Sequence, residues 1–381
     1  MRTKSTFATL LLVFLTPFVG AAQVYTITDL GSLRPTAINS WAQIVGNQNN
    51  QAYLWAFGHL RPLGTLAGGT FSQGAAINDL GVITGSADAP GSVTYPDGTT
   101  QSCADLVQPF LWTLRSGIQA VGAVPGIRAL EGFDLPCPDY EVSAINNQNQ
   151  VVGTNDDIAT YEYGFVWSRS KGWTQFEDGY QTTASGINDS GSAVGQIAAG
   201  LIPELTHAAL WVNGTGTDLG TLGGDSNNFL YCSAANSINN SSQVVGWSTF
   251  GISAGYCFDP ELSPLHAFIW TSSTGMQDLG TLPGDTSSVA VKINLVGQVV
   301  GSSGSQVTVA NTDGAIQVVG RPFIWSARNG MQDLNALIPS NSGWVLNSAS
   351  DINFWGQIIG MGELNGQPHG YLLTPKNPFQ H

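Results

Sequence analysis

The stretch Ile238-Asn-Asn-Ser-Ser-Gln-Val-Val-Gly246 decides the fold, because variants of it recur along the whole chain. Each variant contains an Ile-Asn pair, and a Gly follows the Asn seven residues later without an insertion. The Asn residues are Asn39, Asn78, Asn146, Asn188, Asn239, Asn294 and Asn353, and the Gly residues are Gly46, Gly85, Gly153, Gly195, Gly246, Gly301 and Gly360. Seven copies with one fixed spacing indicate an internal repeat.

Each copy contains four short strand-forming segments. They are the segment ending at Ile-Asn, the Val-Val-Gly segment, an aromatic segment such as His266-Ala-Phe-Ile-Trp270, and one such as Gly275-Met-Gln-Asp-Leu-Gly280. Repeats of four short strands are typical of propeller blades. The last copy ends at Leu373 without a fourth segment, whereas Tyr25-Thr-Ile-Thr-Asp-Leu-Gly31 precedes the first copy. We therefore expect an all-β, seven-bladed β-propeller whose N-terminal strand completes the last blade. An open β-solenoid is the alternative.

The N-terminus has the layout of a secretory signal. Arg2 and Lys4 precede an apolar run from Phe7 to Gly20, and small residues then precede Gln23. We expect a cleaved signal peptide over residues 1–22, a single propeller domain over 23–375 and a short tail over 376–381. The mature protein is then secreted, either extracellular or periplasmic, with no membrane insertion after cleavage.

Composition excludes several classes of function. Only 10% of the 381 residues are charged, which disfavours a protein of exposed helices, and the net charge is −14. A strongly acidic chain disfavours binding to nucleic acid or to anionic lipid.

Four cysteines follow the leader, and none lies in a Cys-x-x-Cys pair. Zinc and redox motifs are therefore weak, and an even number of cysteines in an exported chain favours disulfides. Of three possible connectivities we expect Cys103 with Cys137 and Cys232 with Cys257. The second pair flanks one hairpin, and the first lies in successive long connections.

The repeated polar residues are expected to be structural. Asn-x-x-Gly recurs, as in Asn294-Leu-Val-Gly297, and favours a turn in which Asn bonds its own backbone. The Gly seven residues after each Asn permits a bulge or a close backbone approach. His207 and His266 open the aromatic segments of two copies, but Gln, Tyr or Arg opens others, so no shared histidine chemistry is expected.

Function is expected in the long connections. The second-to-third and fourth-to-first connections vary in length and emerge on one face of the disc, where loops on a rigid scaffold serve recognition. Candidate ligand-binding residues there are Tyr161, Trp247 and Tyr256, and the expected ligand is a polysaccharide or an extracellular protein. No catalytic residue, metal site or cofactor is expected, although calcium stays an alternative that no motif supports. The competing hypothesis is a carbohydrate-active hydrolase or lyase that uses acidic loop residues, among them Asp156, Asp157 and Glu204. A spacer without a ligand is a third possibility, and the oligomeric state stays open.

The phrases Asp218-Leu-Gly-Thr-Leu-Gly-Gly224, Ile238 to Gly246, His266-Ala-Phe-Ile-Trp270 and Gly275 to Gly280 resemble those of the HAF family of extracellular bacterial repeat proteins. The resemblance covers residues 25 to 373. Departures are Gln-Pro-Phe at 108 to 110 and Arg-Pro-Phe at 321 to 323. The resemblance implies export and repetition but no activity, so it assigns no site residue.

Overall fold

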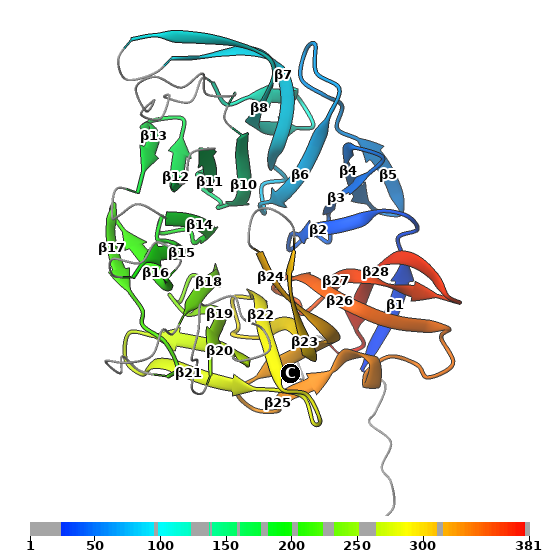
Figure 1. Cartoon of the computed structure of the whole chain (residues 1–381). Coiled ribbons are helices and arrows are strands. Elements are labelled where there is room, and N and C mark those ends of the chain that lie inside the picture. The colour runs from blue at the N-terminus through cyan, green and yellow to red at the C-terminus, as the bar shows by residue number, and fades with distance from the viewer. Residues whose placement is uncertain are drawn as a thin grey trace, which may run out of the picture.

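The computed structural model describes residues 24–94, 98–122, 137, 139–157, 161–176, 182–199, 205–223, 232–250, 264–310 and 315–377. These residues form seven four-stranded antiparallel sheets arranged in a ring, a seven-bladed β-propeller (Figure 1). The expected fold class is therefore confirmed. The expected signal peptide lies outside the described residues, and no helix among those that are described is long and apolar enough to cross a membrane.

In every blade the first strand lies nearest the axis and the fourth lies at the rim (Figure 1). The strands are, for blade 1, β2 (Arg34–Ile38), β3 (Ile44–Gln48), β4 (Gln51–Ala56) and β5 (His59–Pro62); for blade 2, β6 (Ser72–Ile77), β7 (Ile83–Thr94), β8 (Thr100–Thr113) and β9 (Gly117–Ala120); for blade 3, β10 (Asp139–Ile145), β11 (Val151–Asp157), β12 (Tyr161–Ser168) and β13 (Gly172–Gln175); for blade 4, β14 (Thr182–Ile187), β15 (Ala193–Ala198), β16 (Thr206–Val212) and β17 (Thr215–Asp218); for blade 5, β18 (Ser233–Ile238), β19 (Val244–Thr249), β20 (Leu265–Thr271) and β21 (Gly275–Gly280); for blade 6, β22 (Ser287–Ile293), β23 (Val299–Ala310), β24 (Ala315–Ser326) and β25 (Gly330–Asp333); for blade 7, β26 (Trp344–Ile352), β27 (Ile358–Leu364), β28 (Gln367–Pro375) and β1 (Tyr25–Asp29).

The ring closes within blade 7, because β1 pairs with β28 from the opposite end of the chain. The register runs from Tyr25 opposite Pro375 to Asp29 opposite Tyr371. Tyr25 is fully buried and packs in one cluster with Tyr371 and Leu373. The expected closure is confirmed, and it pairs the outer edge of β28, which blade 7 would otherwise leave exposed.

The repeated Gly is required by a bulge in the first strand of every blade. The register of each first-to-second strand pair shifts by one residue, for example between Ala235 and Ser237. The bulge pushes a carbonyl against the opposing Gly, so that a Cβ on Gly246 would lie 1.8 Å from the oxygen of Ala234. Only a residue without a side chain fits that position.

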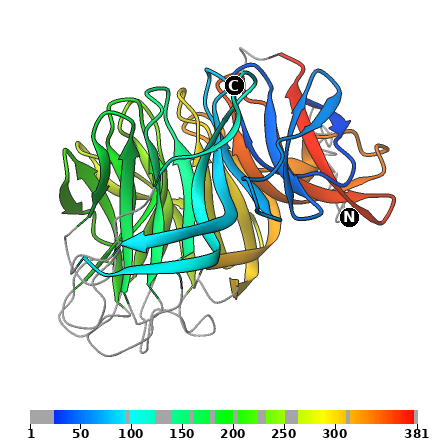
Figure 2. The same ribbon diagram turned by 90° about the horizontal axis from the view of Figure 1, so that it is seen from above.

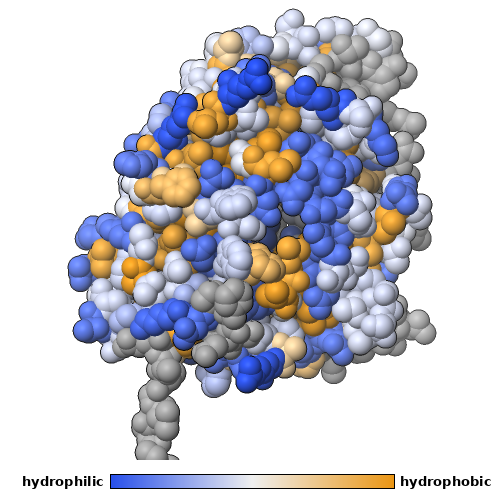
Figure 3. All heavy atoms as spheres, turned by 180° about the vertical axis from the view of Figure 1, so that it is seen from behind, coloured by the Kyte–Doolittle hydropathy of each residue, from blue (hydrophilic) through white to orange (hydrophobic). Residues whose placement is uncertain are grey.

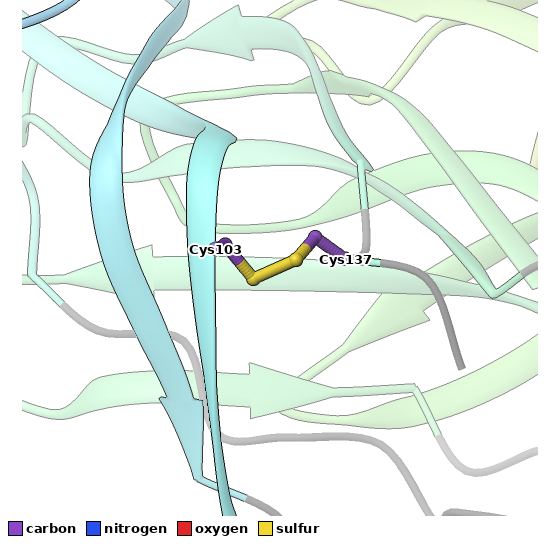
Figure 4. The surroundings of a disulfide bond; sticks show 2 residues. All are labelled: Cys103 and Cys137. Atoms are coloured by element: carbon purple, nitrogen blue, oxygen red, sulfur yellow. A yellow bond between two sulfur atoms is a disulfide. The ribbon is translucent and has the colours of Figure 1, made fainter. Parts of the chain in front are cut away.

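Two of the long connections are extended hairpins rather than loops. In blade 2 the strands β7 and β8 continue beyond the blade, and Figure 2, which shows the disc from its edge, places this hairpin at one side of it. Cys103 on β8 forms a disulfide with Cys137 (Figure 4), which confirms the first expected pair. Cys232 is also disulfide-bonded, whereas its expected partner Cys257 lies outside the described residues.

Candidate functional site

The seven Asn-x-x-Gly turns lie together at one end of the ring, which we call the Asn-turn face (Figure 3). Each turn joins the first strand of a blade to the second. The turns surround an axial pocket of about 210 Å³, whose lining consists of the Ile and Asn of each copy and the residue that follows them. The pocket appears as the pit at the centre of Figure 3.

Within each turn the Asn side chain bonds its own backbone, as expected. Asn39 Oδ1 accepts hydrogen bonds from the N–H groups of Trp41 and Gln43, both at 3.0 Å. Asn39 itself is only 3% exposed, so these bonds satisfy a buried polar group.

The same Asn residues also form a closed ring that the turn alone does not explain. The Nδ2 of each Asn donates to the main-chain oxygen of the Asn in the next blade, at distances from 2.9 to 3.3 Å. The last of these bonds joins Asn353 to Asn39 at 3.0 Å and closes the circle. Seven buried amides therefore tie neighbouring blades together at the axis.

Replacement of one ring amide by an acid should destabilise the whole propeller. Asn294 Nδ2 donates to Asn353 O at 3.0 Å and to Gln298 Oε1 at 2.7 Å. In Asn294→Asp both bonds are lost, and a carboxylate oxygen faces these two acceptor oxygens. We expect the free energy of unfolding to fall by about 2 to 4 kcal/mol in chemical denaturation. The exposed Asn329→Asp in a rim turn is the matched control and should change it by less than about 0.5 kcal/mol. Equal effects of the two variants would contradict a structural role for the ring.

A second set of bonds lies outside this ring and runs around only part of the face. The N–H groups of Ser40, Asp79, Asn147 and Asp189 each donate to a side-chain oxygen of the next blade. This series of bonds ends at Asn240. The residues that follow the turn Asn in blades 6 and 7 are Leu295 and Phe354, whose side chains have no oxygen to accept a bond. Among the described residues, the N–H groups of Asn240, Leu295 and Phe354 have no acceptor.

Beside the axial pocket, the Asn-turn face exposes a group of apolar side chains, which we call the apolar sector. Of its members, Leu295 and Phe354 line the pocket itself. The members of the sector are exposed by 40 to 68% and lie in the turns of blades 6, 7, 1 and 2. They are Leu295, Val296, Phe354, Trp355, Trp41 and Leu80. Turn formation needs none of these side chains, because polar residues fill the same positions in blades 3 to 5. Apolar residues beside the pit are visible in Figure 3.

Both tryptophans of the apolar sector are pinned by their indole nitrogens. Trp41 Nε1 donates to Asp79 O at 3.0 Å, and Trp355 Nε1 donates to Ser40 O at 3.0 Å. Each ring therefore bridges two neighbouring blades while 68% of Trp41 and 40% of Trp355 stay exposed. The only polar atom of each side chain is satisfied within the protein, so the ring itself is what the surface presents.

A groove of about 760 Å³ adjoins the axial pocket on the same face. It lies between blades 2 and 3, with blade 4 at one end, and its lining includes Gln119 of β9, Gln148, Arg169 and Lys171. Asp189 lines both the groove and the axial pocket, so the two hollows adjoin at this residue. Burial alone would raise the pKa of Asp189, but hydrogen bonds from Asn147 and Asn240 outweigh it and lower the pKa, so the carboxylate is ionised at neutral pH.

At the rim, the histidines pair with aspartates of the fourth strands. His207 Nδ1 lies 2.8 Å from Asp218 Oδ2, and His266 and His369 make the same contact with Asp278 and Asp29. In blade 6, Arg321 replaces His and bonds Asp333 and Asp285. The Asp is absent from the three copies that have Gln or Tyr at the His position. This co-occurrence indicates that the pair holds the outer strand.

These pairs make stability sensitive to acid. Burial alone would raise the pKa of Asp218 and Asp278, but the bonds from His and from a Gly N–H outweigh it and lower both pKa values. A lowered folded-state pKa gives stability that is present above about pH 4 and is lost as the pH falls below it.

We expect the melting temperature to fall more steeply between about pH 5 and 3 in the native protein than in Asp218→Asn/Asp278→Asn. Both carboxylates are substantially exposed, so each pair contributes at most about 1 kcal/mol. Glu363→Gln, an exposed carboxylate without an ion pair among the described residues, is the control and should keep the native slope. Parallel curves for all three proteins would refute the role of these pairs.

The residues singled out from the sequence are not brought together. Trp247 lies in β19, is 4% exposed and packs in one cluster with Leu265 and Val289, so its ring is closed to a ligand. Tyr161 begins β12, but its side chain lies outside the described residues, as do Tyr256 and Glu204. Asp156 and Asp157 lie in β11, and their side chains are likewise not described. No three His, Cys, Asp or Glu side chains cluster in the described part of the chain.

Sequence reasoning missed the apolar sector, although a signal was available. In Asn294-Leu-Val-Gly297 and Asn353-Phe-Trp-Gly356 apolar residues occupy the two central turn positions, where polar residues are usual. Blades 3 to 5 have polar residues at both of these positions, so the apolar pairs indicate where the Asn-turn face differs between blades.

The fold and the Asn-turn face define a seven-bladed β-propeller with an axial pocket, an adjoining groove and an apolar sector. No family model and no curated protein matches the chain. Among solved structures, it is similar to an oligogalacturonate lyase in complex with manganese, at 11% identity, a TM-score of 0.49, and coverage of 93% of this chain and 99% of that one. It is also similar to virginiamycin B lyase from Staphylococcus aureus, at 8% identity, a TM-score of 0.48 and coverage of 92% and 99%.

A third similar structure is the extracellular domain of a one component system from B. thetaiotaomicron, at 10% identity and a TM-score of 0.46. The match covers 93% of this chain and 40% of the length of that one. At these identities the likeness concerns the fold alone.

Proposed function

We propose that the protein is an exported, non-catalytic binding module that holds a polysaccharide on its Asn-turn face. The carrying observation is the pair of pinned, exposed rings of Trp41 and Trp355 on this face, each one residue beyond a residue that lines the axial pocket. A pyranose ring has an apolar C–H face that stacks on an aromatic ring, and its hydroxyl groups need donors and acceptors nearby. The HAF-like repeats and the disulfides support export, because disulfides persist in oxidising compartments.

The polar partners that a sugar needs lie beside the rings. The N–H groups of Leu295 and Phe354 have no acceptor among the described residues, and both residues line the axial pocket. No described Lys, Arg or His lines that pocket, whereas Asp79 and Asp189 do. Neutral sugar units are therefore the expected occupants of the mouth of this pocket, since an anion would meet two carboxylates there. The long connections on the other face, where the sequence predicts recognition, lie partly outside the described residues.

The test uses the mature chain, Gln23 to His381, with cellohexaose, mannohexaose and chitohexaose in calorimetric titrations, with and without calcium. We expect at least one of them to bind, and Trp41→Ala and Trp355→Ala each to weaken it by about tenfold. Trp41→Phe keeps a ring face but loses the bond to Asp79 O, so its loss should be smaller.

Phe57→Ala, which removes a ring that is 84% exposed elsewhere, is the control and should bind like the native protein. Three blank titrations would overturn a saccharide site at the mouth. Self-association of the native chain that Trp41→Ala abolishes would instead assign the apolar sector to a second copy.

A further inference from the structure

We infer that the groove between blades 2 and 3 binds carboxylate-bearing sugar units, so that the ligand is an acidic polysaccharide. The inference rests on the proposed function and names the chemical class of its ligand. The groove measures about 760 Å³, within the range of about 300 to 1,000 Å³ usual for ligand sites. Asp189 lines both the groove and the axial pocket, so one chain of sugars that passes this residue reaches both.

Two cations line the groove without an ion-pair partner among the described residues. Arg169 and Lys171 stand in the turn between β12 and β13, and neither contacts a described carboxylate. The chain has only 12 Lys and Arg residues against 26 Asp and Glu. The corresponding turns of blades 2 and 6 have one cation each, Arg115 and Arg328, and that of blade 5 has none. A cationic pair facing a cavity of an acidic protein favours an anionic ligand.

The other lining groups suit a sugar rather than a small inorganic anion. Gln119 and Gln148 are exposed amides, Ser116 and Ser170 supply hydroxyls, and part of Trp167 contributes an apolar wall. The carboxylate of Asp189 lies at the end shared with the axial pocket, and both of its oxygens accept hydrogen bonds from neighbouring blades. It would repel an anion from that end. A bound sugar acid therefore places its carboxylate toward Arg169 and Lys171 and its neutral neighbours toward the mouth.

The experiment compares hexagalacturonate with its fully methyl-esterified form, which has the same sugar chain without the carboxylate charges, in calorimetric titrations with the mature chain. We expect the acid to bind at least about tenfold more tightly than the ester. Arg169→Gln/Lys171→Gln should remove that preference and leave cellohexaose binding unchanged. Arg34→Gln/Arg328→Gln makes the same change in net charge at exposed cations outside the groove lining and should keep the preference.

The salt dependence of the affinity distinguishes attraction by Arg169 and Lys171 from repulsion by the net negative charge of the whole protein. If Arg169 and Lys171 hold the carboxylate, affinity for hexagalacturonate falls as NaCl rises from about 50 to 500 mM. If the net charge of −14 governs the encounter, affinity rises over the same range and the inference is overturned. Loss of the charge preference in both double variants, or in neither, also overturns it.

The outcomes for the two sites are distinguishable. Cellohexaose binding that depends on Trp41, with no preference for the acid, leaves the proposed function standing and removes the groove from it. If hexagalacturonate binding depends on Arg169 and Lys171 but is unchanged in Trp41→Ala and Trp355→Ala, the groove site is supported. The proposed saccharide site at the two Trp rings is then contradicted.

Discussion

We expect that a chain lacking Val24–Gly31 will not fold into a stable propeller, and that the same residues will restore folding when they are attached to the C-terminus. The strand β1 supplies the fourth strand of blade 7 by pairing with β28. Its removal takes the fully buried Tyr25 out of the core and exposes the edge of β28. Loss of one large buried aromatic side chain costs about 3 to 5 kcal/mol, and a native domain has only about 5 to 15 kcal/mol in total.

A circular permutant is the control, because Tyr25 lies directly opposite Pro375. It begins at Ser32, continues to Lys376, and adds an Asn-Gly hairpin turn followed by Val24–Gly31. Its four-stranded blade then contains the same residues in one continuous run. We expect it to melt cooperatively within a few degrees of the native chain in calorimetry, while the deletion shows no cooperative transition. A deletion variant that melts like the native protein would mean that closure by β1 is dispensable.

The second large effect is expected from Gly246→Ala. A Cβ at Gly246 would lie 1.8 Å from the oxygen of Ala234 and 3.0 Å from the Cα of Ala235. Both neighbours are backbone atoms of β18, which pairs with β19 and packs between β14 and β22 of the adjacent blades, so relief requires the bulge itself to rearrange. We expect the free energy of unfolding to fall by about 3 kcal/mol or more, measured by urea denaturation.

Gly275→Asn in the same blade separates this clash from a general need for glycine. Gly275 has a φ of +66°, and a Cβ added to it would meet no heavy atom within 4 Å. Asn tolerates that conformation, so the loss should stay below about 1 kcal/mol. A loss in Gly246→Ala no larger than in Gly275→Asn would refute the account of the bulge.

The repeated hairpin and the order of the strands could be predicted from short stretches of the sequence. The constant spacing from Asn to Gly implies one hairpin in every blade, and the missing fourth segment after Leu373 implies that Tyr25 to Gly31 returns to the last blade. Both were predictable because they depend on residues near each other in the chain or on a simple count of segments. The pairing of Cys103 with Cys137 was predictable for the same reason.

The candidate site was not predictable in this way. The bond from Asn353 Nδ2 to Asn39 O joins residues at the two ends of the chain, and nothing in either turn indicates it. The exposure of Trp41 and the burial of Trp247 follow from which face each blade turns to its neighbours. The sequence alone does not distinguish the exposed Trp from the buried one, because burial depends on contacts between blades.

The sequence by itself therefore determined the number of blades, the hairpin in each and the way the ring closes, because these follow from local periodicity and from the order of segments. The tertiary structure alone decided which residues meet at the axis. Arg169 and Trp41 lie far apart in the chain, yet closure of the ring places them on one face, and only that placement makes the groove and the pocket adjoin there.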